Sequence, residues 1–537
     1  MAVVIVDGHE IQLQDNERLN GIQVAARVGI EIPHYCWHPG LTVVASCRMC
    51  LVEVGRRDAQ TGKITMQPKL SPACQTPATD GTVFVTNSQK VAEARARVEE
   101  GLLIRHPIDC PICDKAGECL LQDYHFRYGQ DARRADLKPF TSRRRELGET
   151  VTLFVDRCVM CSRCVRFCRE IAGTSELLVA HRGAHEEIDV FPGAPLANKL
   201  AGNVVDLCPV GALGDRDFLY QQRVWFLQGQ AHVCANCSKG CSIRVDQNQD
   251  RIYRVKPRTN PHVNRWWICD EGRYGWKHVH DPRRLTKCQR RTGNELQVSE
   301  SSPLLAELDA RLRRSHKLAA VVSPHLTVEE AYLLCRYVRD IDPEAALVLG
   351  PVPQVGEDQT YAGQFTIRAE KCPNRRGVEE LIAGIAGKLV TWEQFLPRLP
   401  DERWDAVWVS GGYLGEWNDT ATAEQFASVG TLVVQDLFSS PLLRRADYQL
   451  PGAAAYEREG SYVNRADWIQ SFSWAIRPPA GVLTEGQVYW RLRKGSGLFP
   501  ARRVLDEVSH AILYFRAADR PIPELGLDLK VNLLAST

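Results

Sequence analysis

The chain has 537 residues, a formal net charge of +2 and 19 cysteines. This length predicts roughly three to five domains, and the balanced charge excludes the basic footprint of a nucleic-acid or anionic-membrane binder. No stretch is long and apolar enough to span a bilayer. Asp7 lies where a secretory signal would be apolar, so we do not expect export. Cysteines in C-x-x-C pairs then predict metal thiolates in a reducing compartment.

The first segment predicts a small α+β unit. Two short apolar runs around Asp7 and Gly8 predict a hairpin, and the run LNGIQVAARVGI has helical spacing. A cysteine loop and a strand-like CLVEV follow. The spacing C-x10-C-x2-C-x23-C resembles plant-type [2Fe–2S] sites, whose first gap is shorter. Structural zinc is the alternative, which the hairpin–helix context disfavours. This first set is Cys36, Cys47, Cys50 and Cys74.

A helix is expected next, from about Asn87 to Gly101, leading into RHPIDCPICDKAGEC and then a basic, polar linker. Three cysteines in this stretch need a fourth ligand, and no other cysteine lies nearby. His106, which precedes a proline, could be the fourth ligand, although a lone histidine at such a position is usually an ordinary loop residue. As a ligand it would replace an anionic thiolate by a neutral imidazole and raise the potential of a cluster. This second set is His106, Cys110, Cys113 and Cys119.

The stretch CVMCSRCVRFC looks like one run of a two-cluster ferredoxin, in which the fourth cysteine ligates the other cluster. If Cys208-Pro209 ends the second run, its three earlier ligands have become Asn198, Ala201 and Val204. One [4Fe–4S] site then survives, and Cys168 is a spare thiol. Cys168 as fourth ligand in place of Cys208 is the alternative. This third set is Cys158, Cys161, Cys164 and Cys208.

The fourth set has the spacing C-x2-C-x3-C-x27-C, for which a zinc ribbon is the serious alternative to a [4Fe–4S] cluster. It consists of Cys234, Cys237, Cys241 and Cys269. Five cations lie within or beside the four sets and could stabilise reduced clusters, although each alone is expected to be a solvated surface cation. They are Arg48, Lys115, Arg163, Arg166 and Lys239.

From about Lys317 onward, short apolar runs alternate with helical ones, which predicts an α/β domain with a mostly parallel sheet. Thr327 and Glu330 form a candidate capping box. Cys335 lies in an apparent amphipathic helix and is expected to be a buried structural thiol, and Cys288 and Cys372 are isolated. We find no dinucleotide fingerprint, because the glycines around Gly411 make only a weak match.

Together, the motifs SCRMCLVEV, HPIDCPICDKAGECLLQD, CVMCSRCVRFCREIAG and CPVGAL resemble the large iron–sulfur subunit of NADH:quinone oxidoreductase, the 75-kDa or G chain of respiratory complex I. The resemblance implies one [2Fe–2S] and two [4Fe–4S] clusters at the first three sets, and a further [4Fe–4S] cluster at the fourth. The stretch after Cys269 and the run ADYQLPGAAAYEREGSYVNRADWIQ are similar to molybdopterin oxidoreductases.

The resemblance implies an electron-transfer subunit without a complete active site or catalytic residues of its own. Electrons from an NADH-oxidising flavoprotein partner would pass the [2Fe–2S] site and then the His-ligated and all-Cys [4Fe–4S] sites. They would leave to iron–sulfur subunits of the quinone-reducing module. The cluster of the fourth set would lie off this path with a structural role. Flavin and NAD would sit on a partner. The subunit would lie in the peripheral arm at the cytoplasmic face of the inner membrane, without nucleic acid and without a membrane span.

This chain departs from the family in its short C-terminal region, since 268 residues follow Cys269. That shortness, and Glu271 where molybdenum enzymes have a lysine, predict a domain without molybdopterin. Two alternatives remain. One is an electron-transfer or catalytic subunit of a soluble NAD-linked formate dehydrogenase or hydrogenase. The other is a structural assembly subunit that lacks some clusters.

The expected fold class is multidomain, α+β followed by α/β. The predicted domains, in chain order, are a β-grasp [2Fe–2S] ferredoxin (1–84), a His/Cys3 [4Fe–4S] segment with linker (85–150), a bacterial-ferredoxin-like [4Fe–4S] domain (151–222), a small molybdopterin-oxidoreductase-type [4Fe–4S] domain (223–290) and a truncated molybdopterin-oxidoreductase-like α/β domain (291–537).

Overall fold

A computed structural model describes residues 2–132, 134–135, 137–141, 143–183 and 185–530, so three residues of the predicted basic linker lie outside the described residues. The chain forms two compact units. The N-terminal unit comprises Met1–Leu227 with Tyr361–Gln364, and the C-terminal unit comprises Gln228–Thr360 with Phe365–Thr537. Among the described residues, no helix has the length and hydropathy needed to cross a membrane.

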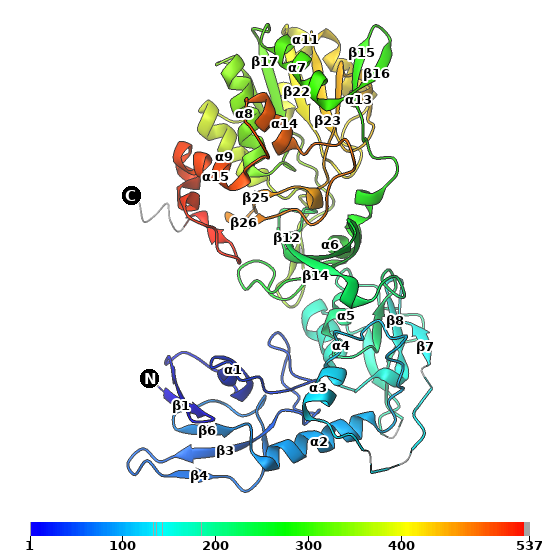
Figure 1. The fold of residues 1–537 in the computed structure, drawn as a ribbon, viewed down its shortest axis with the longest axis vertical. Coiled ribbons are helices and arrows are strands. Elements are labelled where there is room, and N and C mark those ends of the chain that lie inside the picture. Colours follow the sequence, from blue (N-terminus) through cyan, green and yellow to red (C-terminus); the bar gives the residue numbers. More distant parts are fainter. Residues whose placement is uncertain (1, 133, 136, 142, 184, 531–537) are drawn as a thin grey trace. The chain divides into compact units, whose positions relative to one another are not determined.

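The N-terminal unit begins with the predicted hairpin. Strands β1 (Ala2–Val6) and β2 (His9–Leu13) pair antiparallel. Asp7 and Gly8 both have positive φ, 46° and 88°, as the tight turns of hairpins require. The sheet order is β2-β1-β6-β3-β4, and β1 is parallel to β6 (Figure 1). The other strands of this sheet are β3 (Leu51–Arg57), β4 (Ile64–Met66), β5 (Ser71–Pro72) and β6 (Thr82–Val85).

Three helices accompany this sheet and the second set. The predicted helix after the hairpin is α1 (Gly21–Ala26), which a capping box at Asn20 begins. The second predicted helix is α2 (Gln89–Leu103), whose N-cap is Ser88. A third helix, α3 (Leu120–Tyr128), begins directly after Cys119 and was not predicted.

The rest of the N-terminal unit carries the third set on two short helices. α4 (Arg163–Phe167) contains Cys164, and α5 (Asn203–Leu207) ends at Cys208. Small antiparallel sheets support these helices, one of order β11-β8-β7 and one formed by β9 and β10. Their strands are β7 (Arg144–Glu146), β8 (Val151–Phe154), β9 (Leu177–Ala180), β10 (Glu187–Val190) and β11 (Leu213–Asp215).

The C-terminal unit opens with an antiparallel sheet that carries the fourth set. Its strands are β12 (Gln228–Val233), β13 (Ser242–Asn248) and β14 (Arg251–Pro257). Cys234 follows β12 directly, and Cys241 precedes β13 directly. Cys269 is the N-cap residue of α6 (Asp270–Tyr274). Strand ends and a helix start therefore bring four distant cysteines into one region.

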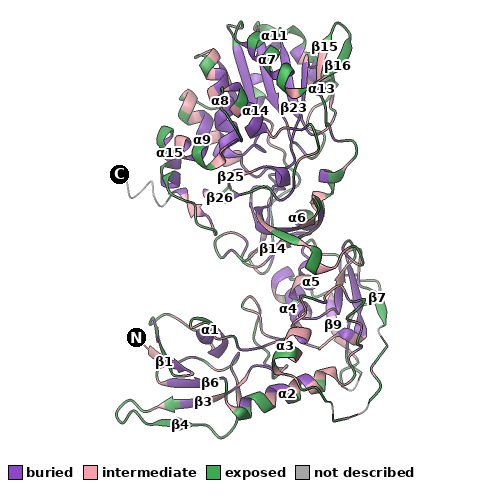
Figure 2. Cartoon of the chain, viewed as in Figure 1, coloured by how far each residue is buried: buried purple, intermediate pink, exposed green. Residues whose placement is uncertain are grey.

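The predicted strand–helix alternation is present in an eight-stranded sheet of order β16-β15-β24-β23-β22-β17-β18-β21, whose central strands run parallel. Figure 2 shows these strands as a buried layer beside the helices. The predicted capping box of Thr327 and Glu330 begins α8, and Cys335 is buried inside that helix, as predicted. The bounds are β15 (Cys288–Thr292), β16 (Glu295–Ser299), β17 (Leu318–Val322), α8 (Val328–Ile341), β18 (Ala346–Leu349), α9 (Arg375–Ala386), β21 (Val390–Thr391), β22 (Ala406–Ser410), β23 (Leu432–Asp436) and β24 (Tyr448–Pro451).

Candidate metal centres

The first set lies on the loop before β3 and directly after β5. Its thiols form two hydrogen-bonded pairs, Cys36 with Cys47 and Cys50 with Cys74. The hydrogen bonds lower the pKa of Cys36 and Cys50 and raise the pKa of their partners, because each pair shares one proton. Two pairs suit a two-iron cluster, in which four thiolates are divided between two irons.

A zinc ion and an iron–sulfur cluster require different distances between their ligands. Tetrahedral Zn–S bonds of about 2.3 Å hold the sulfurs roughly 3.8 Å apart. Within the described part of the chain, no three His, Cys, Asp or Glu side chains lie close enough to share one metal ion. Clusters hold their ligands farther apart, since several irons and sulfides lie between them.

The third set surrounds one cavity. Its lining includes Cys158, Cys161, Cys164 and Cys208, together with apolar side chains such as Leu153 and Ile188. Cys168 is not among the lining residues; it is buried, and burial with the nearby Glu176 raises the pKa of its thiol to about 12. The structure thus brings Cys208 to the trio, whereas Cys168 does not line the cavity.

The loop of the third set is shaped by unusual backbone angles. Met160 and Ser162 have positive φ, 47° and 54°, one residue before and one after Cys161. Such left-handed turns bend the chain sharply, so the loop wraps around the cavity. Burial raises the pKa of Cys161 to about 11 and that of Cys158 further. The thiols of a cluster-free site would be neutral, so cluster binding must release protons.

The second set is the most open. Cys110 is exposed, Cys119 is partly exposed and Cys113 is buried. Burial, with the nearby Arg157, lowers the pKa of His106 to about 4, so its imidazole is neutral at pH 7 and has a lone pair for a metal. Burial raises the pKa of Cys113, and Arg157 opposes this rise, so the histidine and the thiol both interact with one cation. Arg157 is itself held by Asp109 at 2.9 Å.

The fourth set is fully enclosed. All four thiols are buried, and burial raises their pKa, that of Cys269 to about 12. The amide of Cys234 donates to the carbonyl of Cys241 at 2.8 Å, and the amide of Gly272 donates to the sulfur of Cys269 at 3.4 Å. Glu271 pairs with Lys371 at 2.5 Å.

The expectation that each nearby cation is a solvated surface group is wrong for two of them. Arg163 is 7% and Arg166 is 2% exposed. The guanidinium of Arg166 donates to the carbonyl of Cys36 in the first set and, at 3.2 Å, to that of Cys161 in the third set. The guanidinium of Arg163 likewise donates hydrogen bonds to the carbonyls of Trp37 and Leu207. Sequence spacing could not reveal the links to Cys36, Trp37 and Leu207, which span 130, 126 and 44 positions.

Comparisons with known protein families agree with this layout. The matching families, with the residues matched, are the 2Fe-2S iron-sulfur cluster binding domain (3–89), the NADH-ubiquinone oxidoreductase-G iron-sulfur binding region (95–134), the ferredoxin-like domain of NADH-quinone oxidoreductase subunit 3 (148–214), the molybdopterin oxidoreductase Fe4S4 domain (231–281) and molybdopterin oxidoreductase (393–484).

Curated relatives confirm the predicted resemblance. The G chain of the NADH-quinone oxidoreductase of Rickettsia felis is 34% identical over 330 residues, which cover 61% of this chain and 47% of that protein. The NADH-ubiquinone oxidoreductase 75 kDa subunit of Reclinomonas americana is 38% identical over 274 residues, covering 51% and 38%. The corresponding G chain of Streptomyces coelicolor is 35% identical over 346 residues, covering 63% and 39%. The chain spans about half or less of the length of these relatives.

One solved structure, a crystal structure of an NAD+-reducing [NiFe]-hydrogenase in the H2-reduced state, is 26% identical and has a TM-score of 0.35. It covers 42% of this chain and 91% of the hydrogenase chain. A likeness of this size has no bearing on function.

Proposed function

We propose that this chain is the electron-transfer subunit of NADH:quinone oxidoreductase, which connects an NADH-oxidising flavoprotein to the quinone-reducing module. The observation that carries the proposal is the cavity lined by all four cysteines of the third set, within a unit that also holds the first two sets. Iron–sulfur clusters bound at such sites accept and release single electrons. The chain's own contribution is to hold them, space them and tune their potentials.

We assign sixteen ligands to one [2Fe–2S] and three [4Fe–4S] clusters. Neutral His106, paired thiols in the first set and cavity-lining thiols in the third set support the assignment. In order of the four sets, the ligands are Cys36, Cys47, Cys50 and Cys74; His106, Cys110, Cys113 and Cys119; Cys158, Cys161, Cys164 and Cys208; and Cys234, Cys237, Cys241 and Cys269.

Replacing His106 should change the reduction potential of the second-set cluster and of no other cluster. In His106→Cys, an anionic thiolate takes the place of a neutral imidazole, so the potential of the second-set cluster should fall by on the order of 100 mV. Redox titration followed by electron paramagnetic resonance measures the change. His125→Gln, which alters a histidine of α3 outside the set, is the matched control and should leave all potentials in place. An unchanged second-set potential in His106→Cys would exclude the histidine as a ligand.

The contacts support a spatial series that differs from the electron path expected from the sequence, in which the His-ligated second set comes between the first and the third. Arg166 joins the first set to the third, through the carbonyls of Cys36 and Cys161. The segment that follows Cys208 joins the third set to the second, since the amide of Leu120 donates to the carbonyl of Pro209 at 2.9 Å. We therefore assign the third set to the middle of the series, with the first and second sets at its ends.

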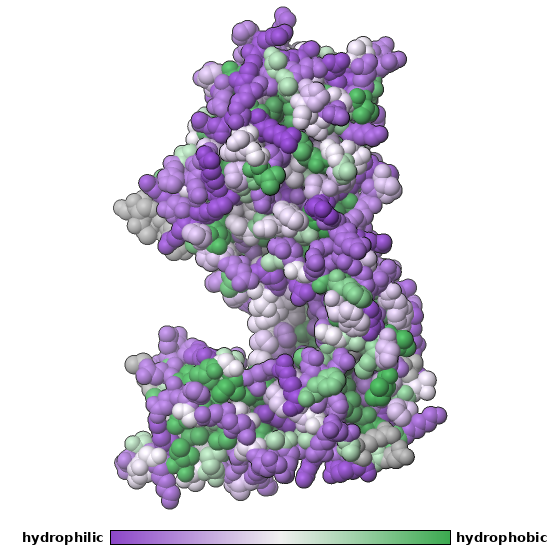
Figure 3. Space-filling view, in the orientation of Figure 1, coloured by the Kyte–Doolittle hydropathy of each residue, from purple (hydrophilic) through white to green (hydrophobic). Residues whose placement is uncertain are grey.

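We propose that electrons leave this chain from the cluster of the second set. Cys110 is exposed, and its carbonyl accepts from Arg223, whose guanidinium lies 4.6 Å from the ring of Trp225. Figure 3 shows apolar groups at the visible surface of the N-terminal unit. Aromatic and aliphatic side chains around an exposed ligand suit the docking of an iron–sulfur subunit of the quinone module. The side chains in this region that are more than half exposed are Ile108, Ile112, Tyr220, Trp225 and Phe226.

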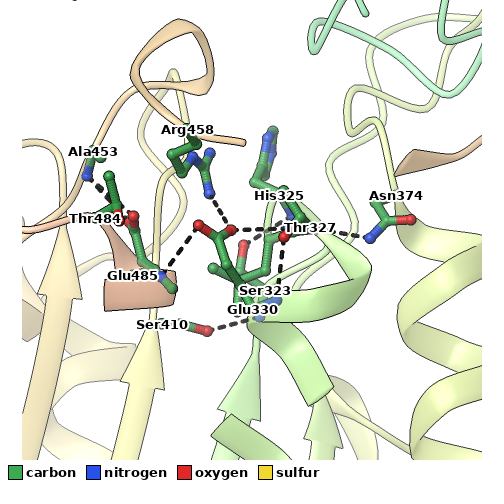
Figure 4. A network of polar contacts seen from close by, with 12 residues as sticks. Ser323, His325, Thr327, Glu330, Asn374, Ser410, Ala453, Arg458, Thr484 and Glu485 are labelled. Carbon is green, nitrogen blue, oxygen red and sulfur yellow. Dashed lines mark hydrogen bonds and ion pairs between the residues drawn. The ribbon is translucent and has the colours of Figure 1, made fainter. Parts of the chain in front are cut away.

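The C-terminal sheet supports the expectation that no molybdopterin binds. A ligand of an open parallel sheet binds where the strand order reverses, which here is between the carboxyl ends of β17 and β22. Ser323, His325 and Ser410 lie at this point (Figure 4). The amide of Ser323 donates to the hydroxyl of Ser410 at 2.9 Å, and the buried ring of His325 packs edge-on against Tyr413, with 5.0 Å between centroids. The residues present do not fit a large cofactor.

A buried polar network continues from this point. Arg458 donates to Glu330 at 3.1 Å, and Glu330 also accepts from the amides of Thr327 and Gly486. Glu485 accepts from the amide of Ala453 at 3.2 Å. These groups hydrogen-bond to one another within the domain. We assign this domain a docking role and the enclosed fourth-set cluster a structural one.

The proposed domain boundaries are those predicted from the sequence. They define the β-grasp domain 1–84, the segment 85–150, the ferredoxin-like domain 151–222, the small cluster domain 223–290 and the α/β domain 291–537. The mixed sheet with α1 supports the first of these, and the boundary between the two compact units at Leu227 lies close to the start of the fourth. We assign the subunit to the peripheral arm of a membrane complex, at its cytoplasmic face.

Anaerobic reduction tests the function. Visible absorption of the clusters should bleach when NADH and the flavoprotein partner are added together, and NADH alone should have no effect, because flavin and NAD sit on the partner. Bleaching by formate or by hydrogen without any partner would instead support the dehydrogenase or hydrogenase alternative. Bleaching by NADH alone would contradict the proposal.

A further inference from the structure

Gly211 lies against Cys113 of the second set and follows Cys208 of the third set by three residues. A Cβ atom on Gly211 would lie 2.2 Å from the sulfur of Cys113 and 3.2 Å from the Cβ of Lys115. Real Cβ atoms are essentially never found at the first of these distances. The φ of Gly211 lies outside the left-handed region, so the backbone conformation alone does not require glycine. Glycine is required instead because the Cys113 thiol leaves no space for a Cβ atom.

The four residues from Cys208 to Gly211 face both sets. Cys208 and Val210 line the cavity of the third set. Pro209 accepts a hydrogen bond from the amide of Leu120, the residue after Cys119 of the second set. Gly211 then lies against Cys113. A single short stretch of backbone therefore carries one thiol of the third set and packs against a thiol of the second set.

We infer that Gly211 is a positioning residue that fixes the second-set cluster at close range to the third-set cluster. This rests on the proposed function, in which both sets hold clusters. Electron tunnelling falls off exponentially with distance, so a bare backbone between the two centres favours transfer. A side chain at position 211 would push the sulfur of Cys113 outward, and Cys113 cannot yield freely because its cluster and its burial hold it.

The test compares Gly211→Ala with Gly214→Ala in the full chain. Gly214 lies three residues further on in β11, and a Cβ there would meet Leu219 Cδ2 at 3.0 Å and Phe154 Cε2 at 3.3 Å. These are the ends of side chains, which can shift, and neither belongs to a cluster site. Iron content and the potential and resonance spectrum of each cluster are measured for both variants.

Gly211→Ala should remove the second-set signal or shift its potential, while the signals of the third and first sets stay as in the unmodified protein. Gly214→Ala should match the unmodified protein throughout. The inference is overturned if Gly211→Ala leaves the second-set spectrum and potential unchanged, or if it weakens the signals of all sets alike.

A measurement on the unmodified protein covers the case in which Gly211→Ala does not fold. Reducing the second- and third-set clusters together should broaden both of their resonance signals through magnetic coupling, as close centres do. Two independent, unbroadened signals would overturn the inference. Absence of either signal from the unmodified protein would instead count against the proposed function itself.

Discussion

Cys208→Ala should lose one whole cluster, so that the purified chain holds about ten irons in place of about fourteen. The reason is the cavity of the third set, in which Cys208 supplies the fourth thiol from a position 44 residues away from Cys164 along the sequence. A four-iron cluster with one ligand missing is exposed to loss of iron. Iron and sulfide assays, with resonance spectra of the reduced protein, measure the loss.

Cys168→Ala is the matched control, because it removes a buried thiol only four residues from Cys164. It should retain all irons and the third-set spectrum, since Cys168 does not line the cavity. The opposite pattern, with iron lost in Cys168→Ala and kept in Cys208→Ala, would show that the fourth ligand is Cys168.

Arg284→Leu should destabilise the C-terminal unit by about 3–5 kcal/mol, because it leaves a buried carboxylate without its partner. The guanidinium of Arg284 holds both oxygens of Glu457, at 2.6 and 2.7 Å, and the two side chains are 3% and 1% exposed. Arg284 follows the fourth set in sequence and Glu457 belongs to the α/β domain, so this pair joins the two parts of the unit. Urea unfolding, followed by tryptophan fluorescence, measures the shift of the transition.

Two further variants isolate the cause. Arg283→Leu removes the neighbouring arginine, which is 82% exposed and pairs with Asp281, and it should leave the transition in place. The double variant Arg284→Leu/Glu457→Leu should recover much of the lost stability, since no unpaired charge then remains buried. If the double variant is as unstable as Arg284→Leu, the loss comes from packing rather than from the unpaired charge.

Much of the local structure could be predicted from the sequence because its signals are local. Asp7 and Gly8 mark a tight turn between apolar runs, and Thr327 with Glu330 closes a capping box within one helical turn. The ligand sets could be predicted from cysteine spacing for the same reason, since three ligands of each set lie within one loop. The position of Cys208 could be inferred only because a two-run ferredoxin pattern fixes where its end should be.

The links between sets could not be predicted, because they depend on how separate segments pack. Arg166 looks like any loop cation in the sequence, yet it is buried and reaches two carbonyls in different sets. Gly211 looks like a turn glycine, and only its distance from Cys113 reveals what it does. The helix α3 was missed because nine residues with mixed polarity give little periodic signal.

The central claim is that each of the four ligand sets binds an iron–sulfur cluster. Metal analysis of the anaerobically purified chain tests this claim most directly. The account predicts about fourteen irons with matching sulfide, and neither zinc nor molybdenum. Two or more equivalents of zinc with correspondingly less iron, or one equivalent of molybdenum, would contradict it.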